Sequence, residues 1–468
     1  MRDTTMGTLR WLLFSGVALA ASLAVVGEVP VAANGQGSGD SESKMADARL
    51  SAAPVAADDP PRRAVRPSMD DYLSPLTPDV VEHLREVAAR APDRRDDVFI
   101  KVGDSATVNR GFMQCFARSG KVSFGEHGEL AETAAFFRGG KAGGRDPYRR
   151  ASRAAKVGWS AHDALEGSPS PLMREVWAAS PRFALVMFGT NDIEMNRPAV
   201  FADRMRAIVD VLTARGVIPI LSTVIPRNGD DEADRLVPRY GRVIEAIARA
   251  RKVPHIRLHA AMVGLPDRGL MSDGVHPSTL VSGNELRGCD FGQQGLRYGQ
   301  NVRNLLNLRM LDRLRRTVVD GEPAPDAGEA TPSGPARVDA PDRIDRLPHT
   351  VMRSTEGASS NLARYPGCDA DSDESGPEHV YRIDLDEPTR LRLQVLHRRD
   401  TDMDVHLLGE RPTGDACIAR ADTSMVADVP AGTHHVVVDT FVPEGGQAAP
   451  GTYVLLVEPA PDATPGAD

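Results

Sequence analysis

The stretch FIKVGDSATVN, residues 99–109, joins a short apolar run to Gly103, Asp104 and Ser105. Glycine, aspartate and serine all suit tight backbone turns, so the stretch alone predicts a strand that ends in a turn. Ser105 is then either an ordinary turn residue or a nucleophile at the end of a strand. The rest of the chain decides between these two interpretations.

Apolar runs and amphipathic segments alternate through the first part of the chain. Continuous apolar runs predict strands at residues 97–102, 183–188 and 217–225. Helical periodicity occurs at residues 78–91, 199–216, 237–252 and 296–319. This alternation predicts an α/β fold in which helices cover both faces of a central parallel sheet, a three-layer α/β/α sandwich.

The C-terminal part has a different pattern. Short segments that alternate apolar with polar residues lie at 381–385, 390–396, 403–408, 434–441 and 452–458, separated by Pro, Gly and Asp. Such segments are typical of half-buried antiparallel strands. We therefore expect a second, smaller domain with an antiparallel β-sandwich fold.

Segments rich in Gly, Ser, Ala and Pro separate these parts. The predicted division is a signal peptide at 1–33, a disordered linker at 34–75, the α/β domain at 76–319, a linker at 320–345, the β-sandwich accessory domain at 346–460 and a tail at 461–468.

The N-terminus has the pattern of an export signal. Arg2 and Arg10 precede an apolar run at residues 11–26, and small residues follow it. The run is long for a signal core and short for a spanning helix, so a cleaved signal and a retained anchor both stay open. We expect an exported protein, in the periplasm, at the cell surface or outside the cell, with no integral membrane domain beyond this segment.

Four cysteines fit an exported chain with disulfide bonds. We favour pairing Cys115 with Cys289 and Cys368 with Cys417, because each pair then lies within one predicted domain; free buried thiols are the alternative. The chain has no CxxC pair and no closely spaced Cys/His set, so we expect neither a metal site nor a cofactor.

Polar motifs follow the predicted strands or precede helices. A Gly-Thr-Asn-Asp block at 189–192 follows the run 183–188, Gly158 lies in a loop, and an Asp-Gly-Val-His block at 273–276 precedes the last helix of the α/β domain. Catalytic groups of open α/β sheets gather where strands end at their carboxyl edge. Together with Gly-Asp-Ser at 103–105, these ordered blocks resemble those of the SGNH hydrolase superfamily, the GDSL-type esterases and lipases.

The resemblance implies a serine hydrolase with a catalytic triad. Ser105 would be the nucleophile, His276 the general base, and Asp273 the carboxylate that orients the imidazole. The oxyanion hole would consist of the backbone N–H groups of Ser105 and Gly158 and the side-chain amide of Asn191.

We expect a structural role for Asp192, which would bond loop backbone. Taken singly, each block also has a structural interpretation as a turn, a helix cap or a surface ion pair.

The C-terminal stretch DTDMDVHLL, residues 400–408, followed by VPAGTHHVVVDTF and APGTYVLLVE, resembles the bacterial pre-peptidase C-terminal domain, a β-sandwich appended to secreted enzymes. Asp402 and Asp404 are candidate Ca²⁺ ligands, but two carboxylates fall short of the six or more oxygens that calcium takes. Such a module would bind glycans, the cell surface or the catalytic domain, and the sequence does not choose among them.

The formal net charge of −9 disfavours a cationic surface for nucleic acid. We expect a monomeric, exported serine esterase that cleaves carboxylic esters through an acyl-enzyme. Candidate substrates are acetylated carbohydrate, including acylated polysaccharide, short-chain esters and lipid esters. The alternative is a non-catalytic, surface-associated binding protein that uses a hydrolase-like scaffold.

Overall fold

The computed structural model describes residues 68–328, 334–368 and 372–461. The predicted signal peptide, most of the first predicted linker and most of the predicted tail lie outside these ranges. Within them, no helix combines the length and apolar character needed to cross a bilayer.

Four parallel strands form the central sheet in the order β1-β2-β3-β4. Their bounds are β1 (Arg95–Gly103), β2 (Pro181–Met187), β3 (Ile218–Ser222) and β4 (His255–Ile256). All residues of β2 and β3 are buried, which explains why both strands read as continuous apolar runs. In the register of the first pair Gly103 lies opposite Met187, so β1 and β2 end level with each other.

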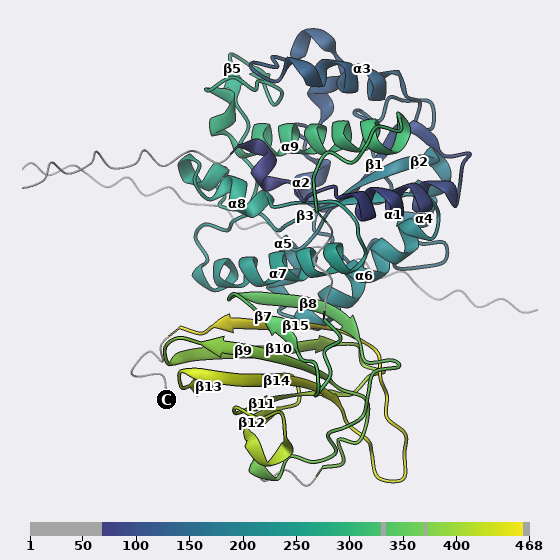
Figure 1. Cartoon of the computed structure of the whole chain (residues 1–468). Helices are drawn as coiled ribbons and strands as arrows, with labels where there is room; N and C mark the ends of the chain where they lie inside the picture. The colour runs from purple at the N-terminus through teal and green to yellow at the C-terminus, as the bar shows by residue number, and fades with distance from the viewer. Residues whose placement is uncertain (1–67, 329–333, 369–371, 462–468) are drawn as a thin grey trace, which may run out of the picture. The chain divides into compact units, whose positions relative to one another are not determined.

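Helices flank this sheet, with α9 on one side and α6 and α7 on the other (Figure 1). The long helices are α1 (Pro78–Ala89), α6 (Pro198–Thr213), α7 (Asp231–Ala250) and α9 (Gly299–Leu314), which continues into a π-helical turn at Arg315–Val319. The shorter helices are α2 (Ser105–Val108), α3 (Ala131–Gly139), α4 (Pro171–Ala179), α5 (Thr190–Glu194) and α8 (Leu258–Met262). The predicted parallel sheet is therefore confirmed, and the four predicted helices are present with shifted ends.

Residues 68–75 are folded, although we expected them to belong to a disordered linker. Met69–Tyr72 form a 3-10 helix, and Leu73 pairs with Ile256 in an antiparallel bridge. The Ser74 N–H donates to the His255 carbonyl at 2.9 Å, so the segment lies along the free edge of β4. The prediction was wrong because it followed the composition of the segment and missed the burial of Leu73.

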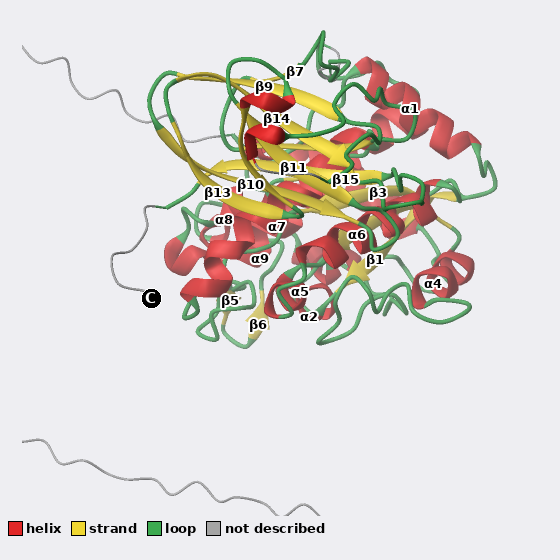
Figure 2. Cartoon of the chain, turned by 90° about the horizontal axis from the view of Figure 1, so that it is seen from below, coloured by secondary structure: helices red, strands yellow, loops and turns green. Residues whose placement is uncertain are grey.

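The C-terminal region contains two further sheets, with strand orders β13-β10-β15-β8 and β12-β11-β14-β9-β7 (Figure 2). The strands are β7 (Asp342–Ile344), β8 (His349–Ser354), β9 (His379–Leu385), β10 (Thr389–His397), β11 (Met403–Leu408), β12 (Cys417–Ala421), β13 (Ser424–Val429), β14 (Gly432–Thr440) and β15 (Thr452–Pro459). One hydrophobic cluster takes residues from both sheets, among them Val405 and Leu455.

Strand β7 corrects two expectations. It pairs with β9 in parallel, so this sheet is mixed and not purely antiparallel. It also lies inside the stretch 320–345 that we expected to be a linker. The strand was not predicted because Ile344 is its single buried apolar residue, and one such residue produces no hydrophobic period.

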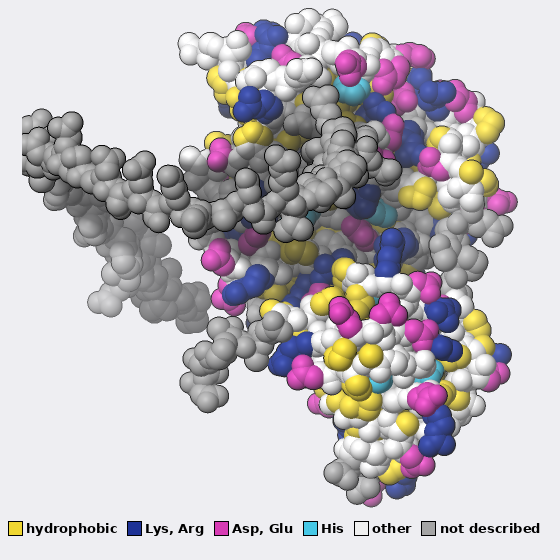
Figure 3. All heavy atoms as spheres, turned by 60° about the vertical axis from the view of Figure 1, so that its left-hand side comes forward, with side chains coloured by type: hydrophobic (Ala, Val, Ile, Leu, Met, Phe, Trp, Pro, Cys, Tyr) yellow, Lys and Arg dark blue, Asp and Glu magenta, His cyan; other side chains and the backbone are white. Residues whose placement is uncertain are grey.

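The α/β part and the C-terminal sheets contact each other through α7. Glu458 on β15 is buried and accepts hydrogen bonds from both Arg239 and Arg242 of that helix. Met352 and Val454 join the hydrophobic core of the α/β part. On the face shown in Figure 3, basic and acidic side chains are interspersed.

Both disulfides have the pairing that the sequence favoured. Cys115 bonds to Cys289 within the α/β part, and Cys368 bonds to Cys417 within the C-terminal region. Each bond ties a loop to a distant segment of its own region.

We predict that replacing Cys115 and Cys289 by serine lowers the free energy of unfolding by about 2–5 kcal/mol, because the lost bond joins residues 174 positions apart and restricts the unfolded chain. Denaturant unfolding without added reductant, in which the native chain keeps its disulfides, measures this change. The matched pair Cys368→Ser and Cys417→Ser opens a separation of only 49 residues and should cost less. An unchanged unfolding midpoint in the first variant would contradict the prediction.

Candidate functional site

The Gly-Asp-Ser turn lies at the carboxyl end of β1. Asp104 is the N-cap of α2, and its side chain accepts a hydrogen bond from the Ala106 N–H at 3.0 Å. Ser105 is consequently the first residue of the helix. A Cβ atom on Gly103 would lie 2.4 Å from the Met187 carbonyl oxygen, so only glycine allows the ends of β1 and β2 to approach so closely.

Ser105, His276 and Asp273 form a continuous chain of hydrogen bonds. The His276 Nε2 atom lies 2.8 Å from the Ser105 Oγ, and its Nδ1 atom lies 2.8 Å from the Asp273 Oδ2. The side chains of Asp273 and His276 are 45% and 30% exposed, so this chain opens to solvent on one side. The structure thus brings together the three residues predicted as a triad.

The loop that carries Asp273 and His276 is held in place by backbone bonds. The Met271 N–H donates to the His276 carbonyl at 2.8 Å, and the Asn228 N–H, from the loop after β3, donates to the Gly274 carbonyl at 2.9 Å. Gly274 has φ +69°, and a Cβ there would lie 2.4 Å from the Asn228 oxygen. A shift of this loop would therefore break its hydrogen bond to Asn228, in the loop that follows β3.

Asp273 is held in its ionised form. Burial opposes ionisation, but the backbone N–H groups of His276 and Val275 and the His276 ring outweigh it and lower the pKa of the Asp273 carboxyl below its ordinary value. An ionised carboxylate favours the imidazole tautomer with its proton on Nδ1, which leaves Nε2 free to accept a hydrogen bond from the Ser105 hydroxyl.

The loop before Gly158 is pinned to the end of β1. The Gly103 N–H donates to the Ala154 carbonyl and the Lys156 N–H donates to the Gly103 carbonyl, both at 3.1 Å. Gly158 itself has φ +76°, a conformation that favours glycine. The backbone N–H groups of Ser105 and Gly158 have no acceptor among the described residues.

The Gly-Thr-Asn-Asp block begins α5 and holds the same loop from the other side. The Asn191 side-chain amide donates to the Trp159 carbonyl at 2.8 Å, and the Asp192 carboxylate accepts from the Ala161 N–H at 3.1 Å. The expected backbone role of Asp192 is confirmed. Asn191 carries an additional bond that we did not expect, and since its amide nitrogen has two hydrogens, the second stays available.

Residues 102–281 match the model of the GDSL-like lipase/acylhydrolase family. This region of the chain is similar to the GDSL-like hydrolases, and we refer to it as the GDSL-like domain. Solved structures that resemble it include a GDSL-like lipase from Bacteroides thetaiotaomicron, at 16% identity and a TM-score of 0.30, covering 50% of this chain and 98% of that one. An acetylxylan esterase from Geobacillus stearothermophilus resembles it at 19% identity and a TM-score of 0.30, covering 46% and 93% of the two chains. No curated protein sequence matches the chain.

Arg303, on α9, contacts the two residues that follow Ser105 in the GDSL-like domain, and no local sequence pattern predicted this contact. Its guanidinium donates to the Ala106 carbonyl at 2.7 Å and to the Thr107 Oγ1 at 3.1 Å, and it stacks over the Phe112 ring at 3.8 Å. Burial raises the pKa of Asp104, and the Arg303 charge opposes this rise. The sequence signal was weak: polar residues recur through a helix that turns out to be buried on nearly all sides.

Four exposed apolar side chains lie next to the site residues of this domain in sequence. The exposed fractions are 38%, 67%, 50% and 48% for Val108, Val157, Met195 and Met271. Val108 follows Ser105 by one helical turn of α2, and Met271 is bonded through its backbone N–H to the His276 carbonyl. Each of the four lies within four positions of Ser105, Gly158, Asn191 or Asp273 along the chain. We call these four residues the apolar rim.

A separate hollow of about 490 Å³ lies away from the triad. It is lined by residues of α9 and of the segments around positions 70 and 326. Its three arginines are already paired, Arg309 with Asp70, Arg313 with Asp326 and Arg316 with Glu322. Volume alone therefore does not single out the candidate site, which is defined by the hydrogen bonds of Ser105.

We predict that Asp192→Asn removes a pH-dependent loss of stability. Burial raises the pKa of Asp192 to about 7, from 3.8, although the Ala161 N–H opposes the rise. Between these two values the folded chain binds more protons than the unfolded chain, so stability falls as the pH rises from about 4 to about 7.

Asparagine keeps an acceptor for Ala161 but has no charge to bury. The free energy of unfolding of the Asp192→Asn variant should exceed that of the native chain by a few kcal/mol above pH 7, since one pKa unit corresponds to about 1.4 kcal/mol. Denaturant unfolding of both chains between pH 4 and pH 8 measures the difference. A difference that stays constant over this range would contradict the prediction.

Proposed function

We propose that the GDSL-like domain hydrolyses carboxylic esters through an acyl-enzyme formed on Ser105. The observation that carries this proposal is the pair of 2.8 Å contacts that link the Ser105 Oγ to His276 and His276 to Asp273. A serine hydroxyl is a weak nucleophile at neutral pH and needs an adjacent base to remove its proton. His276 is the base in this proposal.

The reaction has two halves. The Ser105 Oγ attacks the ester carbonyl carbon while the His276 Nε2 takes its proton, and the resulting imidazolium is stabilised by the ionised Asp273. His276 then gives the proton to the departing alcohol. In the second half, water loses a proton to His276 and attacks the acyl group, which releases the acid and restores Ser105.

The negative oxygen of each tetrahedral intermediate needs fixed hydrogen-bond donors. The N–H groups of Ser105 and Gly158 suit this role because no protein acceptor among the described residues occupies them. Asn191 supplies its second amide hydrogen, while its first holds the Trp159 carbonyl. Donors that are already fixed stabilise the oxyanion without reorganisation, and each typically contributes about two to three orders of magnitude to turnover.

The apolar rim supports a substrate with an apolar acyl group. Acetylated carbohydrate, short-chain esters and lipid esters all contain the reacting ester, but only acyl chains longer than acetyl would extend onto side chains such as Met195 and Met271. We therefore propose short to medium acyl esters as the substrates that the domain prefers. The alcohol part would face solvent over the exposed side of the triad.

We also propose that the protein is exported and that its C-terminal sheets form a β-sandwich accessory domain. The two disulfides fit an oxidising compartment. The hydrophobic cluster that draws on both C-terminal sheets fits a sandwich.

We predict that Ser105→Ala lowers kcat for a p-nitrophenyl ester by at least about 10³-fold, because the nucleophile is lost, and that Asp273→Asn lowers it by about 10²–10⁴-fold through the wrong imidazole tautomer. Steady-state kinetics measure both. A fluorophosphonate should label the native chain at Ser105 and leave Ser105→Ala unlabelled.

Ser119→Ala is the matched control, since this serine is exposed and lies outside the site. Its turnover and labelling should equal those of the native chain. If the native chain neither hydrolyses any of a panel of esters nor reacts with the fluorophosphonate, the catalytic proposal fails and the alternative of a binding protein on a hydrolase-like scaffold takes its place.

We predict that Met271→Gln raises KM for a hexanoyl ester several-fold and changes KM for the acetyl ester less, because only the longer chain loses apolar contact area. Kinetics on a series of p-nitrophenyl esters measure the two effects. Ile418→Gln, at another exposed apolar position in β12, is the control and should leave the series unchanged. Equal changes for all chain lengths would count against the apolar rim as an acyl-binding surface.

A further inference from the structure

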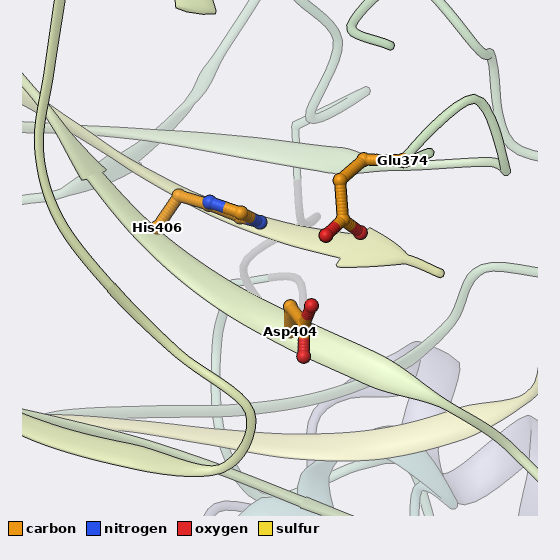
Figure 4. A group of neighbouring side chains, drawn as sticks. All are labelled: Glu374, Asp404 and His406. Carbon is orange, nitrogen blue, oxygen red and sulfur yellow. The ribbon is translucent and has the colours of Figure 1, made fainter. Parts of the chain in front are cut away.

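Glu374, Asp404 and His406 form a buried cluster in the C-terminal region (Figure 4). Asp404 and His406 are two residues apart in β11, so they lie on the same face of the strand. Glu374 comes from the segment that precedes β9. One ligand atom from each residue lies within 4.8 Å of those of the other two, and Figure 4 shows the three side chains pointing toward one another.

Several polar atoms of this cluster lack a partner. His406 is fully buried, yet neither of its ring nitrogens has a hydrogen-bond partner, and the Glu374 Oε2 atom also has none. Buried polar atoms are paired in the great majority of cases, and each exception needs an explanation. The ring of His406 stacks on Tyr365 at 3.6 Å, which fixes its plane but uses neither nitrogen.

Arg420 accounts for only part of the cluster. Its guanidinium lies 2.9 Å from the Asp404 Oδ2 and 3.5 Å from the Glu374 Oε1. One guanidinium faces two carboxylates, so its charge balances only one of them. It makes no hydrogen bond to His406, whose two ring nitrogens both stay without a partner.

We propose that Glu374, Asp404 and His406 bind a divalent ion of the zinc class. Zinc takes imidazole nitrogen and carboxylate oxygen, and three protein ligands leave a fourth position for water. Calcium takes six to eight oxygen ligands and no imidazole, so the presence of His406 disfavours it.

The geometry fits a site that closes on its ion. Ligand atoms at zinc bond lengths of about 2.0–2.2 Å around a tetrahedral ion lie about 3.3 Å apart. The three ligand atoms lie within 4.8 Å of one another, so each pair would have to approach by no more than about 1.5 Å to reach this spacing.

The bound ion fastens the segment before β9 to β11. The Glu374 N–H donates to the Ala363 carbonyl at 3.0 Å, and the Cys368–Cys417 disulfide joins the same part of the chain to β12. The ion would therefore act as a second cross-link of the C-terminal sheets. This role is structural and separate from the chemistry of Ser105.

The test uses the full chain, stripped of metal with EDTA and dialysed. Bound metal is measured by mass spectrometry after incubation with Zn²⁺, Ca²⁺ or Mg²⁺ in turn, and thermal unfolding is followed in each ion. We expect Zn²⁺ to bind and to raise Tm with increasing concentration, because an ion that binds only the folded state stabilises it. Binding of Ca²⁺ without Zn²⁺, or of no ion at all, would overturn the proposal.

Variants locate the ion. Glu374→Gln and His406→Gln should each weaken Zn²⁺ binding at least tenfold and remove the rise in Tm, whereas Asp402→Asn, an exposed acid beside β11, should leave both unchanged. Circular dichroism in EDTA reports whether each variant folds. If His406→Gln does not fold, Glu374→Gln decides alone, since glutamine has the shape of glutamate. Zinc binding that is equal in Glu374→Gln and in the native chain refutes the site.

Discussion

The edge of the sheet that carries Ser105 depends on the absence of a side chain at Gly103. A single added carbon would lie 2.4 Å from the Met187 oxygen and 2.3 Å from the Thr107 Oγ1, so the ends of β1 and β2 and the start of α2 meet at this point. The N–H and carbonyl of the same residue bond to residues 154 and 156. One backbone position thereby fixes the Gly-Asp-Ser turn, the block after β2 and the loop of Gly158 relative to one another.

Three buried ionisable side chains bond the backbone of the segments that meet at this edge. Asp104, Asp192 and Arg303 are almost completely buried, and burying charged groups without compensation costs several kcal/mol. Here each group bonds backbone of a segment that carries a site residue: the Ala106 N–H, the Ala161 N–H and the Ala106 carbonyl. Burying these groups costs free energy, and the hydrogen bonds that they make hold the loops of the site in place.

The sequence predicted the parts of the fold that depend on long, continuous patterns. The strands ending at Gly103 and Met187 are buried on both faces, so their apolar runs were visible, and parallel strands bring the blocks that follow them to one edge. The structure does place Ser105, His276 and Asp273 within hydrogen-bond distance. Short elements were not predictable, because β4 has two residues and β7 has three, too few for any period.

Contacts between segments that are distant in the sequence were equally unpredictable. Arg303 bonds the Ala106 carbonyl across 197 positions, and Glu374 meets Asp404 only because the C-terminal sheets bring them together. Along the sequence Asp404 stands out only beside Asp402, and two carboxylates are too few ligands for calcium. Residues that act together through folding alone leave no local spacing by which they can be recognised.

The bridge between Leu73 and Ile256 has a consequence for the behaviour of the protein in concentrated solution. β4 is the last strand of the central sheet, and an open strand edge offers unpaired backbone groups on which a second chain can add. Ser74 occupies these groups twice, since its N–H bonds to the His255 carbonyl and its Oγ accepts from the His255 N–H. The segment of the chain that precedes α1 thus shields the sheet against edge-to-edge aggregation.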